Sequence, residues 1–192
     1  MSILDDLQLS NKIALVTGCR RGIGKAMAVG LAEAGADIIG VSRNLELNGS
    51  QVEEEVKALN KNFHSYTCDF SNREALYTFI NQVNVDFPVI DILVNNAGVH
   101  DFDNFLSSNA EKILKKMVDT HLYGSFYCTQ AVIKEMKKNK RGDIIFITSL
   151  AEKQFMQEEW AYTSAKTAVS TMAQCIATVS YTHLTLPTSD LV

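Results

Sequence analysis

The stretch that decides the fold is Lys12-Ile13-Ala14-Leu15-Val16-Thr17-Gly18-Cys19-Arg20-Arg21-Gly22-Ile23-Gly24. Residues 12–17 form a short apolar run, typical of a buried strand, that ends at a glycine. A helical pattern follows over residues 22–34 and closes at Gly35, a residue type favoured just after a helix. The stretch therefore predicts a strand, a glycine-rich turn and a helix in direct succession.

The same alternation continues along the chain. Further apolar runs predict strands over residues 37–41, 63–67, 90–94 and 143–148. Helical patterns separate them: Ser71 and Glu74 resemble a capping box before one helix, a long helix begins near Leu122 and ends in the solvated run 134–140, and a last helix starts near Ala161. Strands that are apolar throughout indicate a parallel sheet covered on both faces. We therefore expect an α/β fold, a Rossmann-type doubly wound parallel sheet with strand order 3-2-1-4-5, whose ligands bind beyond the carboxyl ends of the strands.

Composition excludes several classes of protein. The 192 residues fit one domain, and a net charge of −4 gives no support for nucleic-acid binding. Neither a bilayer-spanning apolar run nor a signal peptide is recognisable, so we expect a cytoplasmic protein without a membrane partner. The four cysteines are scattered without CxxC pairs or metal-ligand spacing, which predicts reduced thiols and no metal site.

The glycine-rich turn is a candidate phosphate site. Gly18, Gly22 and Gly24 allow a diphosphate to approach backbone N–H groups at a helix N-terminus. The residues expected to line this turn are Arg20, Arg21 and Ile23. Glycines also mark ordinary strand–helix turns, but this turn follows a strand and opens a helix at the start of the αβ series. That context predicts dinucleotide binding.

The end of the second strand bears on the choice of cofactor. NAD sites usually place an acidic residue about 20 residues after the glycines. Here Ser42 and Arg43 occupy that region, and Asp37 lies at the wrong end of the strand. Arg43, with help from Arg21, is placed to bind a 2′-phosphate, which favours NADP over NAD. The alternative is that both arginines are solvated loop residues.

Two further segments follow predicted strands. Asp69, beside Phe70, is placed to accept a hydrogen bond from an adenine amino group, or to cap the helix that begins near Ser71, or both. After the fourth strand, small residues in Asn95-Asn96-Ala97-Gly98 allow a cofactor to lie close, and an asparagine there can tie neighbouring strands together. Asn96, Ala97 and Gly98 are therefore candidate cofactor contacts.

Three residues near the fifth strand predict proton-transfer chemistry. Tyr162 and Lys166 are four residues apart on a helix and share one face, and Ser149 ends the fifth strand. An ammonium near a tyrosine stabilises the phenolate, so Tyr162 can exchange a proton with a substrate. The Ser149 hydroxyl can hold the substrate oxygen where charge develops. Each residue alone is unremarkable; their conjunction at strand ends carries the prediction.

Taken together, these motifs resemble the short-chain dehydrogenase/reductase family. The resemblance rests on Thr-Gly-x3-Gly-x-Gly over residues 17–24, Asn-Asn-Ala-Gly over 95–98, and Ser149 with Tyr162-x3-Lys166. It covers about residues 8–177, and residues 16–19 and 35–40 look most like 2-deoxy-D-gluconate 3-dehydrogenases and related gluconate dehydrogenases, followed by 3-oxoacyl-carrier-protein reductases.

The resemblance implies an NAD(P)-dependent enzyme, usually a homotetramer, that interconverts a ketone and a secondary alcohol on a sugar acid or similar small polyol. It implies that Ser149 orients the substrate, that Tyr162 transfers the proton, and that Lys166 binds ribose and tunes Tyr162. Two alternatives are a reductase of the 3-oxoacyl-carrier-protein type and a dinucleotide-binding fragment without catalysis.

Two departures from the family pattern matter. Where the family usually has an asparagine that holds a proton-relay water, this chain has His121, which is either a relay residue or a packed histidine. The family also continues past the catalytic helix into further strands and a substrate lid, whereas residues 179–192 resemble read-through of sequencing-adapter DNA. We therefore expect an incomplete domain over residues 1–178, a non-native tail over 179–192, and no activity from this chain alone.

Overall fold

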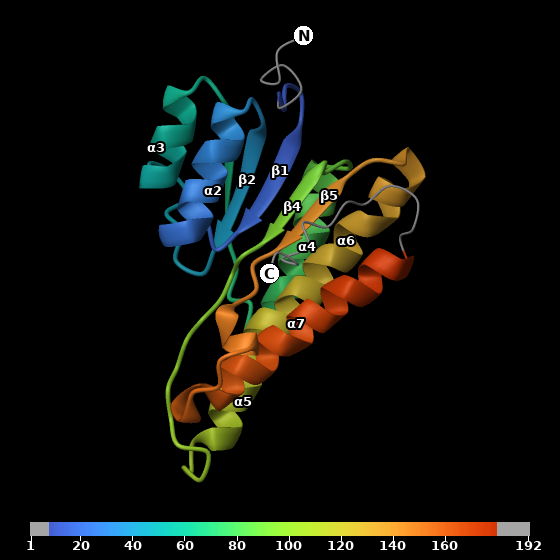
Figure 1. The fold of residues 1–192 in the computed structure, drawn as a ribbon. Helices are drawn as coiled ribbons and strands as arrows, with labels where there is room; N and C mark the ends of the chain where they lie inside the picture. Colours follow the sequence, from blue (N-terminus) through green and yellow to red (C-terminus); the bar gives the residue numbers. More distant parts are fainter. Residues whose placement is uncertain (1–7, 180–192) are drawn as a thin grey trace.

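The fold is built on a parallel sheet of five strands (Figure 1). A computed structural model describes residues 8–179. Within them the strand order is β3-β2-β1-β4-β5, and every neighbouring pair is parallel. The strands are β1 (Ile13–Thr17), β2 (Asp37–Ser42), β3 (Phe63–Thr67), β4 (Ile92–Asn95) and β5 (Asp143–Phe146). The predicted doubly wound fold and its strand order are confirmed.

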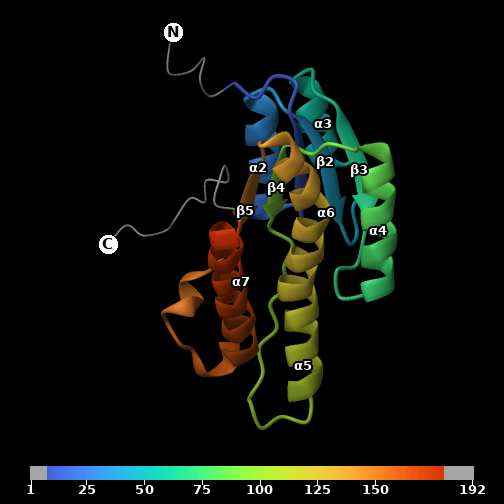
Figure 2. The ribbon, with the colours of Figure 1, turned by 90° about the vertical axis from the view of Figure 1, so that its right-hand side faces the viewer.

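Helices cover both faces of this sheet. One face carries α2 (Gly22–Glu33) and α3 (Gln51–Ala58), as Figure 1 shows. The other face carries α4 (Arg73–Asp86) and α6 (Gly124–Asn139), with α7 (Trp160–Val179) beside α6 in both views (Figures 1 and 2). The helix α5 (Ala110–Met117) extends away from the sheet, below α6.

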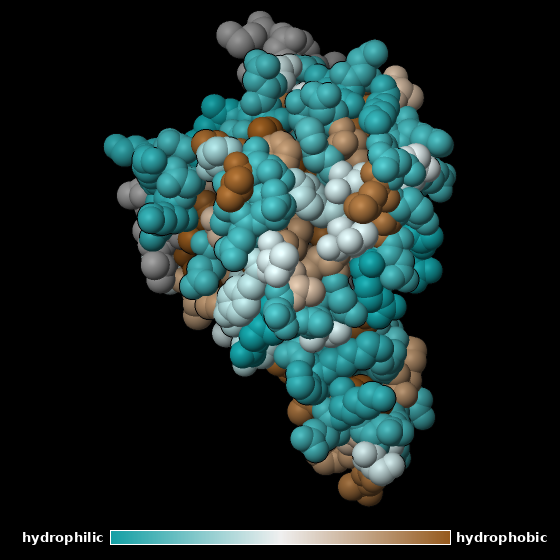
Figure 3. All heavy atoms as spheres, turned by 180° about the vertical axis from the view of Figure 1, so that it is seen from behind, coloured by the Kyte–Doolittle hydropathy of each residue, from teal (hydrophilic) through white to brown (hydrophobic). Residues whose placement is uncertain are grey.

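Alternate residues of each strand enter one of two cores, because successive side chains of a strand point to opposite faces. Ala14 and Val16 of β1 pack with Ala28 of α2, whereas Leu15 between them packs with Leu76 of α4. Figure 3 shows that the face seen from behind is mainly hydrophilic, with small hydrophobic patches.

The helix termini confirm one detail of the sequence analysis and correct another. Gly35 has a φ of +111° directly after the C-cap of α2, as predicted. The N-cap of α4 is Asn72, whose side chain accepts a hydrogen bond from the N–H of Ala75, so the capping box assigned to Ser71 is wrong. Ser71 instead donates its hydroxyl proton to Asp69.

The fifth strand is shorter than the predicted run of residues 143–148. It ends at Phe146, although the N–H of Ile147 still donates to the carbonyl of Asn95. The carbonyl of Ile147 accepts a hydrogen bond from the side chain of Lys166 on α7. The chain therefore leaves the sheet at this point and enters the pocket described below.

The long helix after β4 contains a π-helical segment. The segment Val118–Tyr123 joins α5 to α6, and its flanking residues Met117 and Gly124 keep helical backbone angles. Helical structure therefore runs from Ala110 to Asn139, beginning earlier than the predicted residue 122. Such segments insert one extra residue into an α-helix and occur frequently at functional sites.

The proposed tail over residues 179–192 lies almost wholly outside the described residues, so its assignment stays a prediction. Among residues 8–179, no helix is both long and apolar enough to cross a membrane. The same part of the chain holds no cluster of His, Cys, Asp and Glu suited to a metal ion.

Candidate functional site

The glycine-rich turn is packed tightly against the end of β4. Gly18 has a φ of +70°, which favours glycine, and a Cβ atom there would lie 2.8 Å from Nδ2 of Asn96. A Cβ atom on Gly24 would lie 2.3 Å from both that nitrogen and the carbonyl oxygen of Gly18. Gly22 has a φ of +59° and open space around it. Only glycine therefore allows the turn to pack this closely at Gly18 and Gly24.

Hydrogen bonds clamp the first and fourth strands together where they end. Asn96 donates through Nδ2 to the carbonyls of Thr17, at 2.9 Å, and Gly18, at 3.2 Å. The Thr17 hydroxyl donates to the carbonyl of Val94 and accepts from the N–H groups of Asn96 and Ala97. The prediction that an asparagine ties neighbouring strands together is confirmed. This crevice, at the point where the strand order reverses, is the expected ligand site of the fold.

Three arginines lie near the end of β2: Arg20 and Arg21 on the glycine turn, and Arg43 directly after β2. The Arg20 guanidinium forms an exposed ion pair with Glu46 at 2.7 Å, which lowers the pKa of that carboxyl. The N–H of Arg20 donates to the buried Ser42 hydroxyl, fixing the turn on β2. The guanidinium groups of Arg21 and Arg43 are exposed, line the pocket and have no partner among residues 8–179. Arg20 is thus engaged within the protein, whereas Arg21 and Arg43 are available to a ligand.

Asp69 and Phe70 lie beside this region of the pocket. Oδ1 of Asp69 accepts from both the N–H and the hydroxyl of Ser71, at 2.9 and 2.7 Å, which closes the turn before α4; Asn72 caps that helix, so the capping alternative is wrong. Phe70 is buried against Gly124, where a Cβ atom would lie 2.7 Å from the ring. The contact of Asp69 with an adenine amino group stays a prediction.

Ser149, Tyr162 and Lys166 line one end of the same pocket. The buried Nζ of Lys166 donates to the carbonyl of Ile147 at 2.6 Å and lies 5.8 Å from the centre of the Tyr162 ring. Burial lowers the pKa of Lys166 to about 8, against a smaller opposing effect of Glu152. The arrangement places an ammonium group below the tyrosine ring, as the four-residue spacing predicted.

Ser149 has a second, structural contact. Its Oγ accepts from the N–H of Ala151 at 3.2 Å, while its own N–H donates to Oε1 of Glu152 at 3.3 Å. These reciprocal bonds cap the 3-10 turn Leu150–Glu152. Because a hydroxyl accepts and donates at once, the Ser149 proton remains available to a ligand.

His121 lies in the π-helical segment and is buried. Its Nε2 is 2.7 Å from the carbonyl oxygen of Val99 and 3.2 Å from the N–H of the same residue. A carbonyl only accepts, so the shorter contact places the proton on Nε2 and leaves Nδ1 as an acceptor. Nδ1 is buried without a partner in the described residues. Burial, with the positive charge of Lys166, lowers the pKa of His121 to about 4, so the ring is neutral near pH 7.

The structure adds residues that the sequence analysis missed. His100 lines the pocket, with its ring 4.3 Å from that of Tyr162 and its Nε2 3.3 Å from the buried carboxylate of Glu159. Thr120 has a buried hydroxyl without a partner in residues 8–179, and Lys116 pairs with Asp101 at 2.6 Å. The signal for His100 was its position just beyond Asn-Asn-Ala-Gly, after a strand end. Whether Lys116 and Thr120 face the pocket depends on how the helix is rotated about its axis, which the local sequence does not show.

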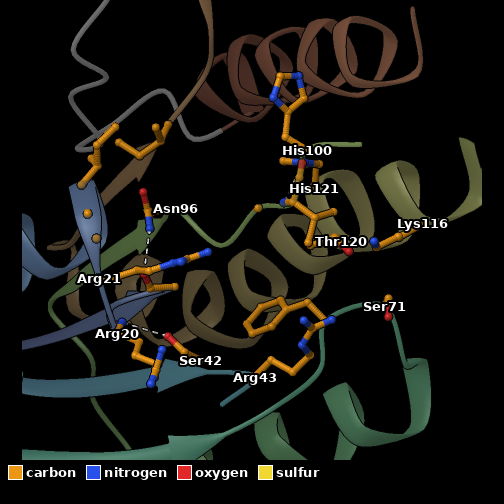
Figure 4. Close-up of a pocket in the computed structure, with 18 of the residues that line it drawn as sticks. Arg20, Arg21, Ser42, Arg43, Ser71, Asn96, His100, Lys116, Thr120 and His121 are labelled. Carbon is orange, nitrogen blue, oxygen red and sulfur yellow. Dashed lines mark hydrogen bonds between the residues drawn. The ribbon is translucent and has the colours of Figure 1, made fainter. Parts of the chain in front are cut away.

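Most of these groups line one pocket of about 970 Å³. Figure 4 shows Arg20, Arg21 and Arg43 at the end near β2, and His100, Thr120 and His121 toward the other end. Glycine turn, helix N-terminus, free guanidinium groups and buried lysine together fit a nicotinamide dinucleotide along this pocket.

Comparisons with known proteins agree with this geometry. The family described as short chain dehydrogenase matches residues 12–184. A 2-dehydro-3-deoxy-D-gluconate 5-dehydrogenase from Pseudoalteromonas atlantica is 47% identical over 175 residues, which cover 91% of this chain and 68% of that protein. A 3-oxoacyl-[acyl-carrier-protein] reductase from Vibrio cholerae is 34% identical, over 85% of this chain and 65% of its own length.

Solved structures give the same result. A metagenomic short-chain oxidoreductase in complex with NADP is 33% identical, with a TM-score of 0.81 over 93% of this chain and 81% of its own. A 3-oxoacyl (acyl-carrier-protein) reductase from Agrobacterium tumefaciens with NADP bound is 27% identical, with a TM-score of 0.85 over 97% of this chain and 71% of its own. The chain belongs to the short-chain dehydrogenase/reductase family, which makes it an NAD(P)-dependent oxidoreductase acting on CH–OH donors.

Proposed function

We propose that this protein interconverts a ketone and a secondary alcohol on a sugar acid, with NADP preferred to NAD. The observation that carries the proposal is the placement of Lys166 against the Tyr162 ring, in one pocket with Ser149 and the glycine turn. The substrate class is supported by the relatives that act on 2-dehydro-3-deoxy-D-gluconate, among them those from Dickeya dadantii and Escherichia coli.

Each polar group at this end of the pocket has a chemical role in the proposal. The bound cofactor supplies or takes up the hydride. Tyr162 donates a proton to the carbonyl oxygen during reduction and removes it during oxidation. Lys166 stabilises the phenolate and hydrogen-bonds the cofactor ribose, and the Ser149 hydroxyl donates to the substrate oxygen.

His121 has a positioning role in this scheme. Its hydrogen bond to Val99 fixes the segment after β4, and its ring lies edge-on to Tyr162 with 5.4 Å between centroids. The unpartnered Nδ1 is an acceptor suited to a water molecule, which would serve the proton relay in place of the usual asparagine. The neutral imidazole accepts such a bond; an imidazolium would not.

The preference for NADP rests on the end of the pocket near β2. The free guanidinium groups of Arg21 and Arg43 offer charge-assisted hydrogen bonds to a 2′-phosphate. The contacts proposed along the rest of the cofactor are with Gly18, Gly22, Ile23, Gly24, Ser42, Asp69, Phe70, Asn96, Ala97 and Gly98, which are in or beside the pocket.

We also propose a cytoplasmic homotetramer. The thiols of Cys19 and Cys68 are buried and free, and burial raises their pKa to about 11 and about 12, which suits a reducing compartment. An apolar groove lies between α7 and the junction of the π-helical segment with α6, is lined by Leu122, Phe126 and Met172 among others, and is available for a subunit contact. Light scattering at several protein concentrations tests the oligomeric state.

The test of the function is a turnover assay of the full-length parent protein, used for every rate measurement below, with NADPH and NADH on three ketones: 5-keto-D-gluconate, an acetoacetyl thioester and a simple cyclic ketone. We expect NADPH-dependent reduction of the sugar acid above the other two. Preference for the thioester would support a 3-oxoacyl-carrier-protein reductase instead. Tight NADPH binding without turnover of any ketone would support a dinucleotide-binding protein without catalysis.

A further inference from the structure

Three groups surround the Tyr162 ring, and one of them is open to a substrate. Lys166 and His121 are both buried, with 6% and 2% of their surface exposed. The His100 side chain retains 38% exposure, although its ring centroid is only 4.3 Å from that of Tyr162. A substrate whose oxygen meets the Tyr162 hydroxyl would therefore bring its neighbouring groups against His100.

The orientation of His100 is fixed by Glu159. The Glu159 side chain is 8% exposed, and its Oε1 lies 3.3 Å from Nε2 of His100. A buried carboxylate needs a hydrogen-bond donor, and it can only accept, so Nε2 carries the proton. In the neutral imidazole Nδ1 is then an acceptor. Figure 4 shows the ring extending from the segment after β4 toward α7.

The loop that carries His100 is held against the start of α7. The indole N–H of Trp160 donates to the carbonyl of Asp103 at 3.0 Å, and the rings of Phe105 and Trp160 meet with 4.9 Å between centroids. The Phe102 ring also packs against that of His100, with 4.3 Å between their centroids. His100 thus has the fixed position that a selective contact requires.

We propose that His100, oriented by Glu159, is a specificity-determining residue that accepts a hydrogen bond from a substrate hydroxyl next to the reacting carbon. The inference rests on the proposed function and deepens it: the favoured substrates are ketones flanked by hydroxyl-bearing carbons, and the matching polyols. An apolar chain of equal length leaves the His100 acceptor unpaired, which disfavours its binding.

Binding is tested by NMR on the full chain with NADP present. D-gluconate should shift the His100 imidazole resonances, assigned by their loss in His100→Phe, whereas hexanoate should not. His64, exposed and packed on Phe87, is the internal control. Gluconate that shifts other pocket residues but not His100 would overturn the inference, and this readout needs no turnover.

Turnover gives a second, independent readout. His100→Phe keeps an aromatic ring against Tyr162 but removes the acceptor, so kcat/KM for 5-keto-D-gluconate should fall about tenfold, while that for 5-oxohexanoate should not change. Glu159→Leu should reproduce this selective loss, and Glu159→Gln, which keeps an acceptor for Nε2, should largely restore wild-type behaviour. Equal losses on both ketones would overturn the inference and leave the proposed function standing. A wild-type protein that reduces 5-oxohexanoate as well as the sugar acid would overturn the proposed substrate class.

Discussion

Lys166 on α7 donates a 2.6 Å hydrogen bond to the carbonyl of Ile147, the first residue beyond β5. This bond ties the helix to the end of the sheet and fixes the position of the ammonium group relative to the Tyr162 ring. It also satisfies one donor of a lysine that is otherwise out of water, where burial disfavours the charged form. The sheet edge and the proposed proton-transfer group are therefore parts of one unit.

The first prediction concerns the charge of Lys166. Its pKa in the folded protein, about 8, lies below the ordinary value of 10.5, so between these values the unfolded chain binds more protons and stability rises with pH. Activity should change in the opposite direction and fall above about pH 8, because Tyr162 loses the neighbouring charge. Lys166→Met should remove this dependence of folding stability on pH. It should also weaken NADPH binding and abolish turnover. Denaturation and rate profiles against pH check this, with exposed Lys112→Met as the control.

The second prediction concerns Tyr162. Tyr162→Phe removes the hydroxyl while keeping the ring contacts with His100 and His121. Turnover should fall by about 10²–10⁴-fold, the usual contribution of a positioned acid or base, with NADPH affinity nearly unchanged. Steady-state rates and a fluorescence titration measure the two effects. Tyr66→Phe on β3, outside the pocket, controls for loss of a tyrosine hydroxyl, and substantial activity in Tyr162→Phe would contradict the assigned proton transfer.

Cofactor choice gives the third prediction. Arg43→Asp replaces a free guanidinium with a carboxylate that repels a 2′-phosphate and accepts from ribose hydroxyls. NADPH should bind roughly ten- to a hundredfold more weakly, the range of a lost charge-assisted hydrogen bond, and NADH should bind more tightly. Titrations with both cofactors test this, and Arg141→Asp, remote from the pocket, should leave their ratio unchanged. An unchanged ratio in Arg43→Asp would show that Arg43 is a solvated loop residue.

The fourth prediction concerns His121. Its folded pKa of about 4 lies below the ordinary 6.5, so the unfolded chain binds more protons between these values and stability falls as the pH decreases through them. The loss amounts to roughly 3 kcal/mol, from 1.36 kcal/mol per pKa unit. His121→Asn should remove this dependence and preserve or raise activity near pH 7. Urea denaturation from pH 4 to 7 measures it, with His64→Asn as the control; a collapse of activity would indicate an essential role for the imidazole.

The glycine turn gives the fifth prediction. In Gly24→Ala the new Cβ would meet Asn96 and the carbonyl of Gly18 at 2.3 Å, so the turn must open and cofactor binding should be lost. Gly30→Ala, in the same helix, meets nothing within 4 Å and should stabilise the protein by about 1 kcal/mol. Thermal melts with and without NADPH compare the two variants. Retained NADPH affinity in Gly24→Ala would contradict the close packing of the turn.

Residues whose roles depend on strand ends were predictable from sequence. An apolar run identifies a strand in any context, and parallel strands bring their carboxyl ends to one edge of the sheet. For this reason the residue pattern was enough to assign Gly18, Asn96 and Ser149 to one pocket. Helical spacing put Tyr162 and Lys166 on one face, and their conjunction with Ser149 at the strand end carried the prediction.

Contacts between distant loops were not predictable in this way. Nothing in the local sequence of His100 indicates Glu159, which lies far along the chain and meets it only after α7 has docked. The contact of Arg20 with the cofactor stays a prediction, but its pairing with Glu46 could not be predicted, because it depends on how the loop after β2 folds back. The capping error at Ser71 arose because neighbouring polar residues compete locally for the same N–H groups.

The π-helical segment Val118–Tyr123 makes the length of this helix part of its function. Deleting one residue there would restore a regular α-helix and leave α5 at nearly the same rotation about the helix axis, because the wide turn itself accommodates the extra residue. Cys128 and Val132 would still hold α6 on the sheet, but the wide turn that places Thr120 and His121 in the pocket wall would be lost. A single-codon deletion in this segment would therefore be selected against even where it spares His121, because the number of residues in the turn sets which of them reach the pocket.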